Sequence, residues 1–435
     1  EPSKLVRNLS MSMSIGSPLP RAPEHGDCVY LDYQATTPVW PEVAAAITPY
    51  LTHHWGNPSS GHAFGRPCGA AIGQARAAVA ELIGAEPSEI CFTGCGSESD
   101  NFAIVGALEM EEARRRGAGG AALPRPHVVA SNIEHPAVEL CIEALCAAGR
   151  LEATYVPVDE EGLVSAEAVA AATTEQTFLV SVMHSNNEVG SVQPVRQIAD
   201  AVRALRPSVL VHTDAAQSIG KVDVDTRALG VDLLTLVGHK FGAPKGIAAL
   251  YIRSGLALPR MIHGGGQESG RRAGTECTPM VVALGTAAAI ARAEAAPLRE
   301  HMRRTRDALE SALVERLPAG STRVNGPADA SRRLPNTLSI GLRDVRAAEL
   351  LETLSERLAA SAGAACHANA ASVSAVLRAL RVPPEFAVGT LRLSTGRHTT
   401  LEEVALAADL IAEEARRQWG QGDGAAGKVS DSGPS

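Results

Sequence analysis

The chain has 435 residues, 45% of them hydrophobic and 20% charged, so it can bury a large core and is expected to form about two or three domains. A formal net charge of −8, with no dense basic run except Arg114–Arg116, argues against nucleic acid or an anionic membrane and favours a small-molecule partner. Eight dispersed cysteines do not fit the disulfide framework of a small secreted domain and indicate a reducing compartment, the cytosol.

The N-terminal stretch, residues 1–26, is rich in Ser, Pro and Met and lacks the apolar segment of a secretory signal. We predict that it is disordered. Further along the chain, Arg, Glu or Gly interrupts even the Ala-rich tracts, so no window of about 18 apolar residues occurs. The sequence therefore predicts a soluble protein with no membrane partner.

Short apolar or β-branched runs alternate with Ala-rich helical stretches from Ile90 onward. This alternation predicts an α/β fold with parallel strands and crossover helices on both faces of the sheet. The predicted strands are Ile90–Thr93, His127–Ser131, Phe178–Met183, Val209–Thr213, Leu233–Val237 and Ala248–Ile252. Ligands of such sheets bind beyond the carboxyl ends of the strands. The polar residues expected there are Ser97, His135, Asn187, Asp214, Gln217, His239 and Lys240.

Two of these positions offer groups that could bind a cofactor. The turn Gly94-Cys95-Gly96-Ser97 links a strand to a helix, and its backbone amides and the Ser97 hydroxyl could hold a phosphate. His135 offers an imidazole that could stack on a planar ring or move protons, although a structural histidine is the alternative.

Asp214 follows one predicted strand and Lys240 follows the next. A desolvated lysine can lose its proton and form a Schiff base. A carboxylate near it could keep a pyridine nitrogen protonated, which pyridoxal phosphate requires. The alternatives are a solvated lysine in a turn and an aspartate that only caps the following helix.

A second domain is predicted after a long helical pattern, residues 286–317, that is interrupted at Pro297; its first strand is Asn336–Gly341. Small residues around Cys366 allow a loop to approach a site, where a thiolate could attack sulfur or selenium, although an inert cysteine is the alternative. Arg392 could clamp a carboxylate or form a surface salt bridge. The tail, residues 419–435, has little to bury and is predicted to be disordered.

Together these motifs resemble the class-V aminotransferase family that contains cysteine desulfurases and selenocysteine lyases. The likeness runs from about Tyr30 to about Ile411. Further matching segments are Leu31–Pro38, Gly56–Ser60, Asn186–Glu188, Gly264–Glu268 and Arg272–Thr275. The resemblance implies a fold-type I pyridoxal-phosphate enzyme: an α/β large domain with a mainly parallel sheet over residues 41–295, and a smaller α+β domain over residues 27–40 and 296–418.

The resemblance also implies roles around the cofactor ring. Lys240 would bind pyridoxal phosphate as a Schiff base and move protons, and Asp214 would pair with the ring nitrogen. His135 would stack on the ring. Gln217 and Asn187 would contact the side of its phenolic oxygen.

The phosphate would be held by Gly96, Ser97 and His239, and Thr275 would reach the site from the other subunit of a homodimer. Arg392 would bind the substrate carboxylate, near Asn187 and Gln34. No metal is implied. Three positions depart from the family pattern. Ser97 replaces a threonine but keeps the hydroxyl, Val237 replaces a serine that donates to the phosphate, and Gln34 is one methylene longer than the usual asparagine.

Cys366 followed by His367 is closest to selenocysteine lyases, so we favour a lyase that converts L-selenocysteine into L-alanine and releases selenide to a reductant. The alternative is a cysteine desulfurase that carries a persulfide on Cys366. A non-catalytic scaffold is a third reading. A selenide or sulfur acceptor protein is left open.

Overall fold

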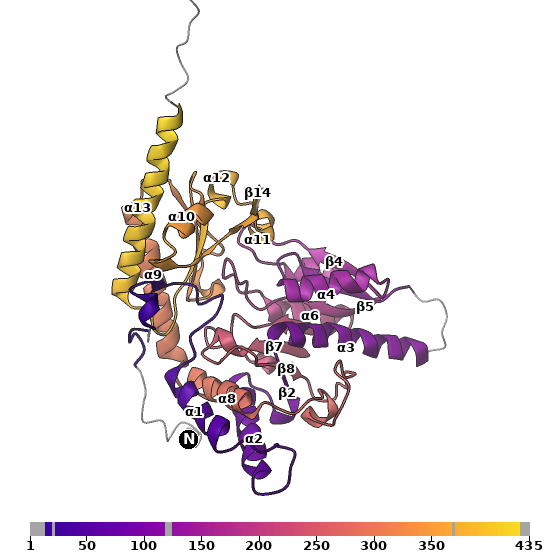
Figure 1. Cartoon of the computed structure of the whole chain (residues 1–435). Coiled ribbons are helices and arrows are strands. Elements are labelled where there is room, and N and C mark those ends of the chain that lie inside the picture. Colours follow the sequence, from indigo (N-terminus) through magenta and orange to yellow (C-terminus); the bar gives the residue numbers. More distant parts are fainter. Residues whose placement is uncertain (1–13, 20–21, 118–123, 368–369, 427–435) are drawn as a thin grey trace, which may run out of the picture.

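The computed structural model describes residues 14–19, 22–117, 124–367 and 370–426, with the backbone alone for Pro23 and residues 364–367, 370–372 and 421–426. Figure 1 shows a larger part, built on a central sheet, and a smaller part that carries the long C-terminal helix α13 (Leu401–Ala426).

Seven strands form the central sheet, in the order β2-β8-β7-β6-β5-β3-β4. Their bounds are β2 (Ile90–Thr93), β3 (His127–Ser131), β4 (Glu152–Val156), β5 (Thr177–Ser181), β6 (Leu210–Asp214), β7 (Leu233–Val237) and β8 (Ala248–Ile252). All pairings are parallel except those of β8, which is antiparallel to both neighbours. The predicted α/β fold with a mainly parallel sheet is confirmed.

Two details of the strand prediction were wrong. The run Ala248–Ile252 is a strand, but it is antiparallel because only residues 238–247 connect it to β7, and a parallel crossover needs about a dozen residues or more. The edge strand β4 was not predicted. Its residues are partly exposed, so it lacks the continuous apolar run of the inner strands, which are buried on both faces.

Helices cover both faces of this sheet. On one face, α3 (Gly96–Gly117) and α4 (Pro136–Ala147) pack on the inner strands through an apolar cluster that includes Ile104, Ile142 and Val128. The other face is covered by α1 (Pro41–Thr52), α2 (Gly65–Leu82), α5 (Ala166–Ala172), α6 (Val195–Leu205) and α8 (Thr278–Ala293). A short helix, α7 (Thr226–Leu229), lies between β6 and β7.

Helices α2 and α8 approach each other closely at Gly285. A Cβ atom at this position would lie 2.4 Å from the Ala75 Cα, so backbone would have to move. We expect Gly285→Ala to lower the free energy of unfolding by about 1–3 kcal/mol, as overpacking of a filled core does. Urea denaturation would measure this, with Gly73→Ala on the open face of α2 as the control. The control should be neutral or stabilising by about 0.5–1 kcal/mol, and equal effects would contradict the packing argument.

The smaller part has a four-stranded antiparallel sheet in the order β12-β15-β10-β9. Its strands are β9 (Thr322–Asn325), β10 (Thr337–Leu342), β12 (Ser361–Ala362) and β15 (Thr390–Ser394). Helices α9 (Ala295–Arg316) and α13 pack on it around buried leucines such as Leu313 and Leu391. The other elements are β1 (Val29–Tyr30), which pairs with β11 (Leu358–Ala359), and the short helices α10 (Ala347–Thr353), α11 (Ala375–Ala379) and α12 (Pro384–Ala387).

The predicted helical run over residues 286–317 is two helices. Helix α8 ends at Ala293 and α9 begins at Ala295, with the break at Glu294 and a bend of 80°. Pro297 explains the break, because its ring excludes the carbonyl of Ala293 from a continuous helix. None of the helices in the described ranges could cross a membrane alone, while this bent pair meets the length and composition criteria together. The domain boundary near residue 295 stays a prediction.

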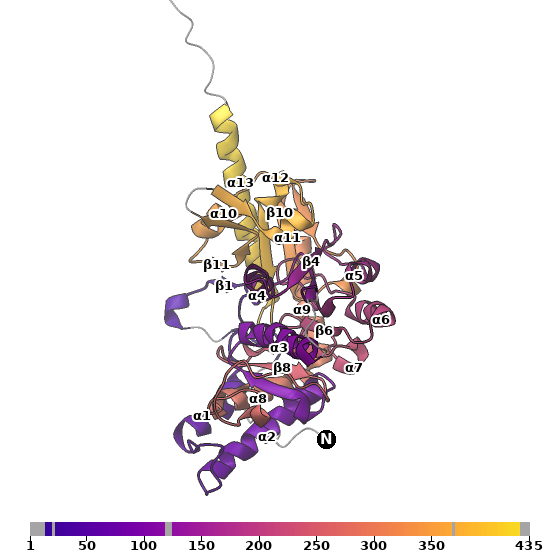
Figure 2. The same ribbon diagram turned by 90° about the vertical axis from the view of Figure 1, so that its right-hand side faces the viewer.

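The described part of each terminal segment that was predicted to be disordered belongs to the fold. The Gly16 amide donates to the Arg397 carbonyl (2.8 Å), so part of residues 1–26 packs on the fold. Helix α13 continues past Trp419 because that indole donates to the Arg343 carbonyl (2.8 Å) and packs on the apolar cluster of the smaller part. Figure 2 shows this helix extending beyond the smaller sheet. Residues 1–13, 20–21 and 427–435 of the two predicted segments lie outside the described residues.

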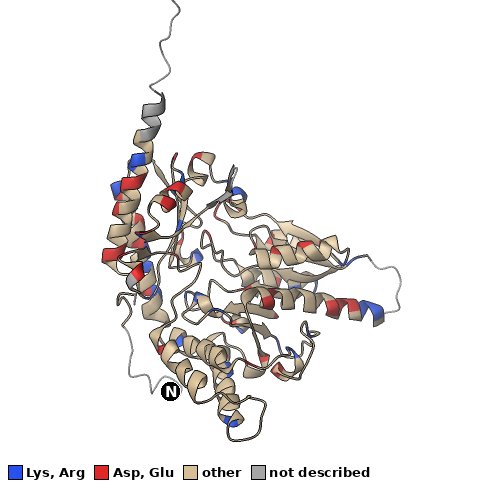
Figure 3. Ribbon diagram, in the orientation of Figure 1, with Lys and Arg blue, Asp and Glu red and all other residues tan. Residues whose placement is uncertain are grey.

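Charged residues lie mainly on the outer faces of the helices. Figure 3 shows both signs along α13 and basic residues at the outer end of α3. The one dense basic run in the sequence is there, and Arg114 pairs with Glu111 (2.7 Å). Basic charge in this run is therefore partly neutralised.

Candidate active site

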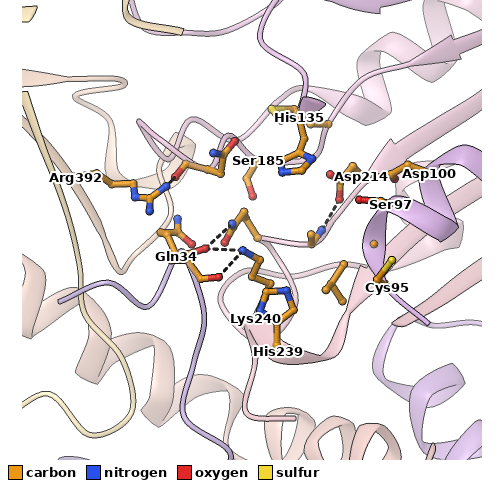
Figure 4. A pocket seen from close by; sticks show the side chains of 17 residues that line it. Gln34, Cys95, Ser97, Asp100, His135, Ser185, Asp214, His239, Lys240 and Arg392 are labelled. Carbon is orange, nitrogen blue, oxygen red and sulfur yellow. Dashed lines mark hydrogen bonds between the residues drawn. The ribbon is translucent and has the colours of Figure 1, made fainter. Parts of the chain in front are cut away.

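A cavity of about 340 Å³ lies beyond the carboxyl ends of the inner strands, between the two parts of the molecule (Figure 4). It is lined by Gln34, Ala35, Cys95, Gly96, Ser97, Asp100, His135, Met183, Ser185, Asn187, Asp214, Ala216, Gln217, Val237, His239, Lys240 and Arg392. All the predicted site residues except Thr275 and Cys366 are therefore in one place.

Lys240 ends the short 3-10 helix that follows β7. Its Nζ donates to the carbonyl oxygens of Gln34 (2.7 Å) and Ala35 (2.9 Å), as Figure 4 shows. Burial lowers the pKa of this amine to about 8, and the positive charge of Arg392 acts in the same direction. An amine with this pKa is partly neutral near neutral pH, as a nucleophilic lysine must be.

Asp214 ends β6 and is 8% exposed. One carboxylate oxygen accepts a hydrogen bond from the Ala216 amide (2.8 Å). Burial raises the pKa of Asp214, while the positive charge of Lys240 and a protonated His135 oppose that rise. A cation bound beside this carboxylate would therefore favour its ionised form.

Asp100 is a second buried acid in the cavity wall, and the sequence analysis missed it. It is 2% exposed and lies beside Asp214 (Figure 4). Its Oδ1 has no hydrogen-bond partner among the described residues and lies 3.7 Å from His212 Nε2. Burial and the charge of Asp214 raise the pKa of Asp100 well above its usual value. Its position three residues after Ser97, on the same face of α3, was the signal that could have found it.

The first turn of α3 begins at Gly96, where a Cβ atom would lie 2.7 Å from Val237 Cγ2. The turn is braced by Glu98, which accepts from the Gly94 amide (2.7 Å) and pairs with Arg272 (2.9 Å). The first turn of any helix leaves backbone amides without intrahelical partners, and these amides and the exposed Ser97 could hold a phosphate.

His135 is the N-cap residue of α4, and its Nδ1 accepts from the Ala137 amide (3.1 Å). Its ring faces the cavity in Figure 4. The preceding residue, Glu134, is buried and accepts from the Met183 amide (3.0 Å), so it ties this turn to the loop after β5. Burial raises the pKa of Glu134 to about 8. These hydrogen bonds fix the position of His135 in the cavity wall.

His239 lies beside Lys240, and its Nδ1 is 3.2 Å from the Thr36 hydroxyl. Burial lowers the pKa of His239 to about 4, with a further contribution from Lys240. The ring is therefore neutral at physiological pH, so it can contribute a hydrogen bond to a bound anion but not a positive charge.

Arg392 enters the cavity from β15 of the smaller sheet. Its guanidinium donates to Asp32 Oδ1 (2.9 Å), the Ser361 hydroxyl (2.7 Å) and the Asn187 carbonyl (3.2 Å). These contacts hold the guanidinium at the junction between the smaller sheet and the loop after β5. A substrate carboxylate at this point would meet a pre-oriented donor.

Two predicted residues are not among those lining the cavity. Thr275 is exposed. Cys366 lies in the hairpin formed by β13 (Ala364–His367) and β14 (Ala370–Val373), where its register partner is Ala371. Its side chain lies outside the described part of the chain. The base of the hairpin is close to the cavity, because Ser361 and Gly363 share a second cavity of about 340 Å³ with Arg392.

The cavity thus combines a desolvated amine, a buried carboxylate, a first helical turn that could hold an anion, and a guanidinium. Such a set could hold pyridoxal phosphate, the cofactor implied by the resemblance, and bind an amino acid beside it. Among the described residues, no group of three or more His, Cys, Asp or Glu side chains is arranged to hold a metal ion.

Comparison with known proteins gives a consistent result. The model of the family described as aminotransferase class-V matches residues 29–406. A protein named cysteine desulfurase IscS from Clostridium botulinum is 38% identical over 384 residues, 88% of this chain and 93% of that protein. One named cysteine desulfurase 2 from Trichormus variabilis is 41% identical over 377 residues, 86% and 90% of the two chains.

Solved structures agree with the sequence relatives. A structure titled NifS-like protein has a TM-score of 0.80 and 35% identity, covering 89% of this chain and 98% of its own. Another, titled SspA in complex with cysteine, has a TM-score of 0.71 and 34% identity, covering 85% and 99%.

Proposed function

The chain belongs to the aminotransferase class-V family and depends on pyridoxal phosphate, and from that premise we propose that it is a cysteine desulfurase, which converts L-cysteine into L-alanine. The observation that carries the proposal is the placement of Lys240, Asp214 and Arg392 around one cavity. The sequence analysis favoured selenocysteine as substrate. Relatives named cysteine desulfurase favour its alternative, cysteine, and selenocysteine becomes the second candidate.

The residues of the cavity fit the cofactor. Lys240 would bind it covalently, Asp214 would pair with its ring nitrogen, and His135 would cover the ring. Gln217 and Asn187 would lie on the side of the phenolic oxygen. When bound, pyridoxal phosphate supplies an electron sink for the bonds at the substrate Cα.

The phosphate would lie on the first turn of α3, at Gly96 and Ser97, next to the neutral ring of His239. Val237 contributes only methyl groups to this wall. We propose that Thr275, which is exposed in the single chain, completes the phosphate site of the other subunit in a homodimer.

The residues of the chain divide the chemistry among them. Arg392 would bind the substrate carboxylate, and the Lys240 amine would take and return the proton at the substrate Cα. The Cys366 thiolate attacks the substrate sulfur: an S–S bond forms while the Cβ–S bond breaks. The electron pair of the broken bond stays with the carbon fragment, which takes up a proton and leaves as alanine. A reductant or acceptor thiol then removes the sulfur from Cys366.

The position of Cys366 in the hairpin supports its assignment as the sulfur acceptor. Ser361, just before the hairpin, accepts a hydrogen bond from Arg392. Cys68, Cys91, Cys95, Cys141, Cys146 and Cys277 are free thiols, which fits the reducing cytosol that we propose as the location. The persulfide would be passed on to a thiol reductant or to an acceptor protein.

The test is alanine formation from cysteine and from selenocysteine, measured anaerobically with the wild-type chain and with Cys366→Ala. A desulfurase should turn over cysteine without any keto acid, and Cys366→Ala should lose most of that activity. Turnover of selenocysteine alone, or activity on selenocysteine that survives in Cys366→Ala, would favour the lyase instead. Dependence on a keto acid would indicate an aminotransferase and contradict both.

The lowered pKa of Lys240 predicts how the rate of cofactor binding depends on pH. Below a pH of about 8 the amine is protonated and cannot attack an aldehyde, whereas above it the neutral amine predominates. The rate at which the apoprotein regains the visible absorption band with pyridoxal phosphate should therefore rise with pH, with a midpoint at about 8. A midpoint at the ordinary lysine value of about 10.4 would show that Lys240 is not desolvated.

A further inference from the structure

A second lysine is buried next to the cofactor site. The sequence contains only Lys4, Lys221, Lys240, Lys245 and Lys428, because arginine supplies most of its positive charge. Lys240 is the expected cofactor lysine. Lys221 is only 4% exposed and has no role in the chemistry described above.

Lys221 bridges two glutamines that line the cofactor site, Gln34 and Gln217. Its Nζ donates to Gln34 Oε1 (3.3 Å), to Gln217 Oε1 (3.3 Å) and to the Gln217 carbonyl (2.9 Å). Gln34 belongs to the segment that follows β1, and Gln217 follows β6. The ammonium therefore connects the N-terminal segment to the central sheet.

The glutamines in turn hold the place where Lys240 rests. The Gln34 carbonyl accepts from Lys240 Nζ (2.7 Å) and from Gln217 Nε2 (3.1 Å). The side-chain amide of Gln34 donates to Thr337 on β10 (2.6 Å). The Gln34 side chain, longer by one methylene than the family's usual asparagine, thus runs between Thr337 and Lys221.

The burial of Lys221 has an energetic cost that needs a reason. An ammonium removed from water is destabilising unless it is paired. Among the described residues Lys221 forms no ion pair with a carboxylate, and its hydrogen-bond acceptors are oxygens of neutral groups. Burial lowers the pKa of Lys221 to about 7, and the charge of Lys240 acts in the same direction. An apolar side chain would fill this space with a smaller desolvation penalty. We therefore infer that the lysine is present for its hydrogen bonds to the two glutamines.

We propose that Lys221 is a positioning residue of the cofactor site. It would fix the side-chain amide of Gln217 beside the cofactor ring and the Gln34 carbonyl that accepts from Lys240. The inference rests on the cofactor site and not on the choice between cysteine and selenocysteine. The charged groups that face Lys240 are Arg392, Asp214 and Asp32.

The test compares Lys221→Met, which removes donor and charge, with Lys221→Gln, which keeps a donor without the charge. Lys245→Met is the matched control, since Lys245 is exposed. The readouts on the holoenzyme are the dissociation constant of pyridoxal phosphate and the wavelength maximum of its visible absorption band. Neither readout requires turnover, so failure here is distinct from failure of the proposed reaction.

Lys221→Met should weaken cofactor binding about tenfold, the loss of one hydrogen bond from a charged donor. It should also shift the wavelength maximum of the band, because the Gln217 amide is no longer held by Lys221. Lys221→Gln should recover part of the affinity, because its amide can still donate a hydrogen bond to Gln34 or Gln217. A folded Lys221→Met variant that matches Lys245→Met in both readouts would overturn the proposal. If the methionine variant fails to fold, Lys221→Ala takes its place, and values equal to those of Lys245→Met would again overturn the proposal.

Discussion

Lys240→Ala is expected to abolish alanine formation, with a loss of about 10⁴-fold or more, as for removal of a covalent nucleophile. The same side chain would bind the cofactor and carry the proton at Cα, so both roles are lost together. The purified variant should also lack the visible band of lysine-bound cofactor. Absorption spectra and an alanine assay would measure the two effects.

The control for this variant is Lys245→Ala, five residues further along the chain on an exposed turn. It should keep both the band and the activity. A Lys240→Ala variant that retained turnover would mean that another amine carries the chemistry. Lys221 is the nearest such candidate, which Lys240→Ala/Lys221→Met would test.

Asp214→Asn is expected to lower kcat by about a hundredfold to several thousandfold, equivalent to the 3–5 kcal/mol lost when one partner of a buried ion pair is removed. Asparagine keeps the size of the side chain, and its oxygen can still accept from the Ala216 amide. The negative charge that would hold the ring nitrogen protonated is lost. The fall should appear mainly in kcat, and steady-state kinetics would measure it.

Asp100→Asn is the matched control, since Asp100 is the neighbouring buried acid. Burial and the charge of Asp214 raise the pKa of Asp100, which favours its neutral form, and asparagine is neutral and of the same size. We expect less than about a tenfold change in kcat, because Asp100 is not the carboxylate assigned to the ring nitrogen. Equal damage in the two variants would contradict the assignment of Asp214 as the charged partner of the ring.

The sequence predicted the inner strands well because burial on both faces requires continuous apolar runs such as Leu233–Val237. The strand prediction failed for strands that are not buried on both faces or whose direction depends on a connection. The edge strand β4 alternates exposed and partly buried residues, and β8 has the composition of a parallel strand but the opposite direction. Direction depends on the length of the connection and not on the strand itself.

The sequence by itself determined the residue types at the ends of the strands: the lysine, the aspartate and the glycine-rich turn follow their apolar runs, and parallel topology brings such ends to one edge of the sheet. Only the tertiary structure placed Asp100 beside Asp214 and joined Lys221 to Gln34 and Gln217. Those contacts depend on burial and on distances between segments far apart in the chain. A pattern of residues along the sequence carries neither quantity, because desolvation and hydrogen-bond geometry arise only when the segments pack together.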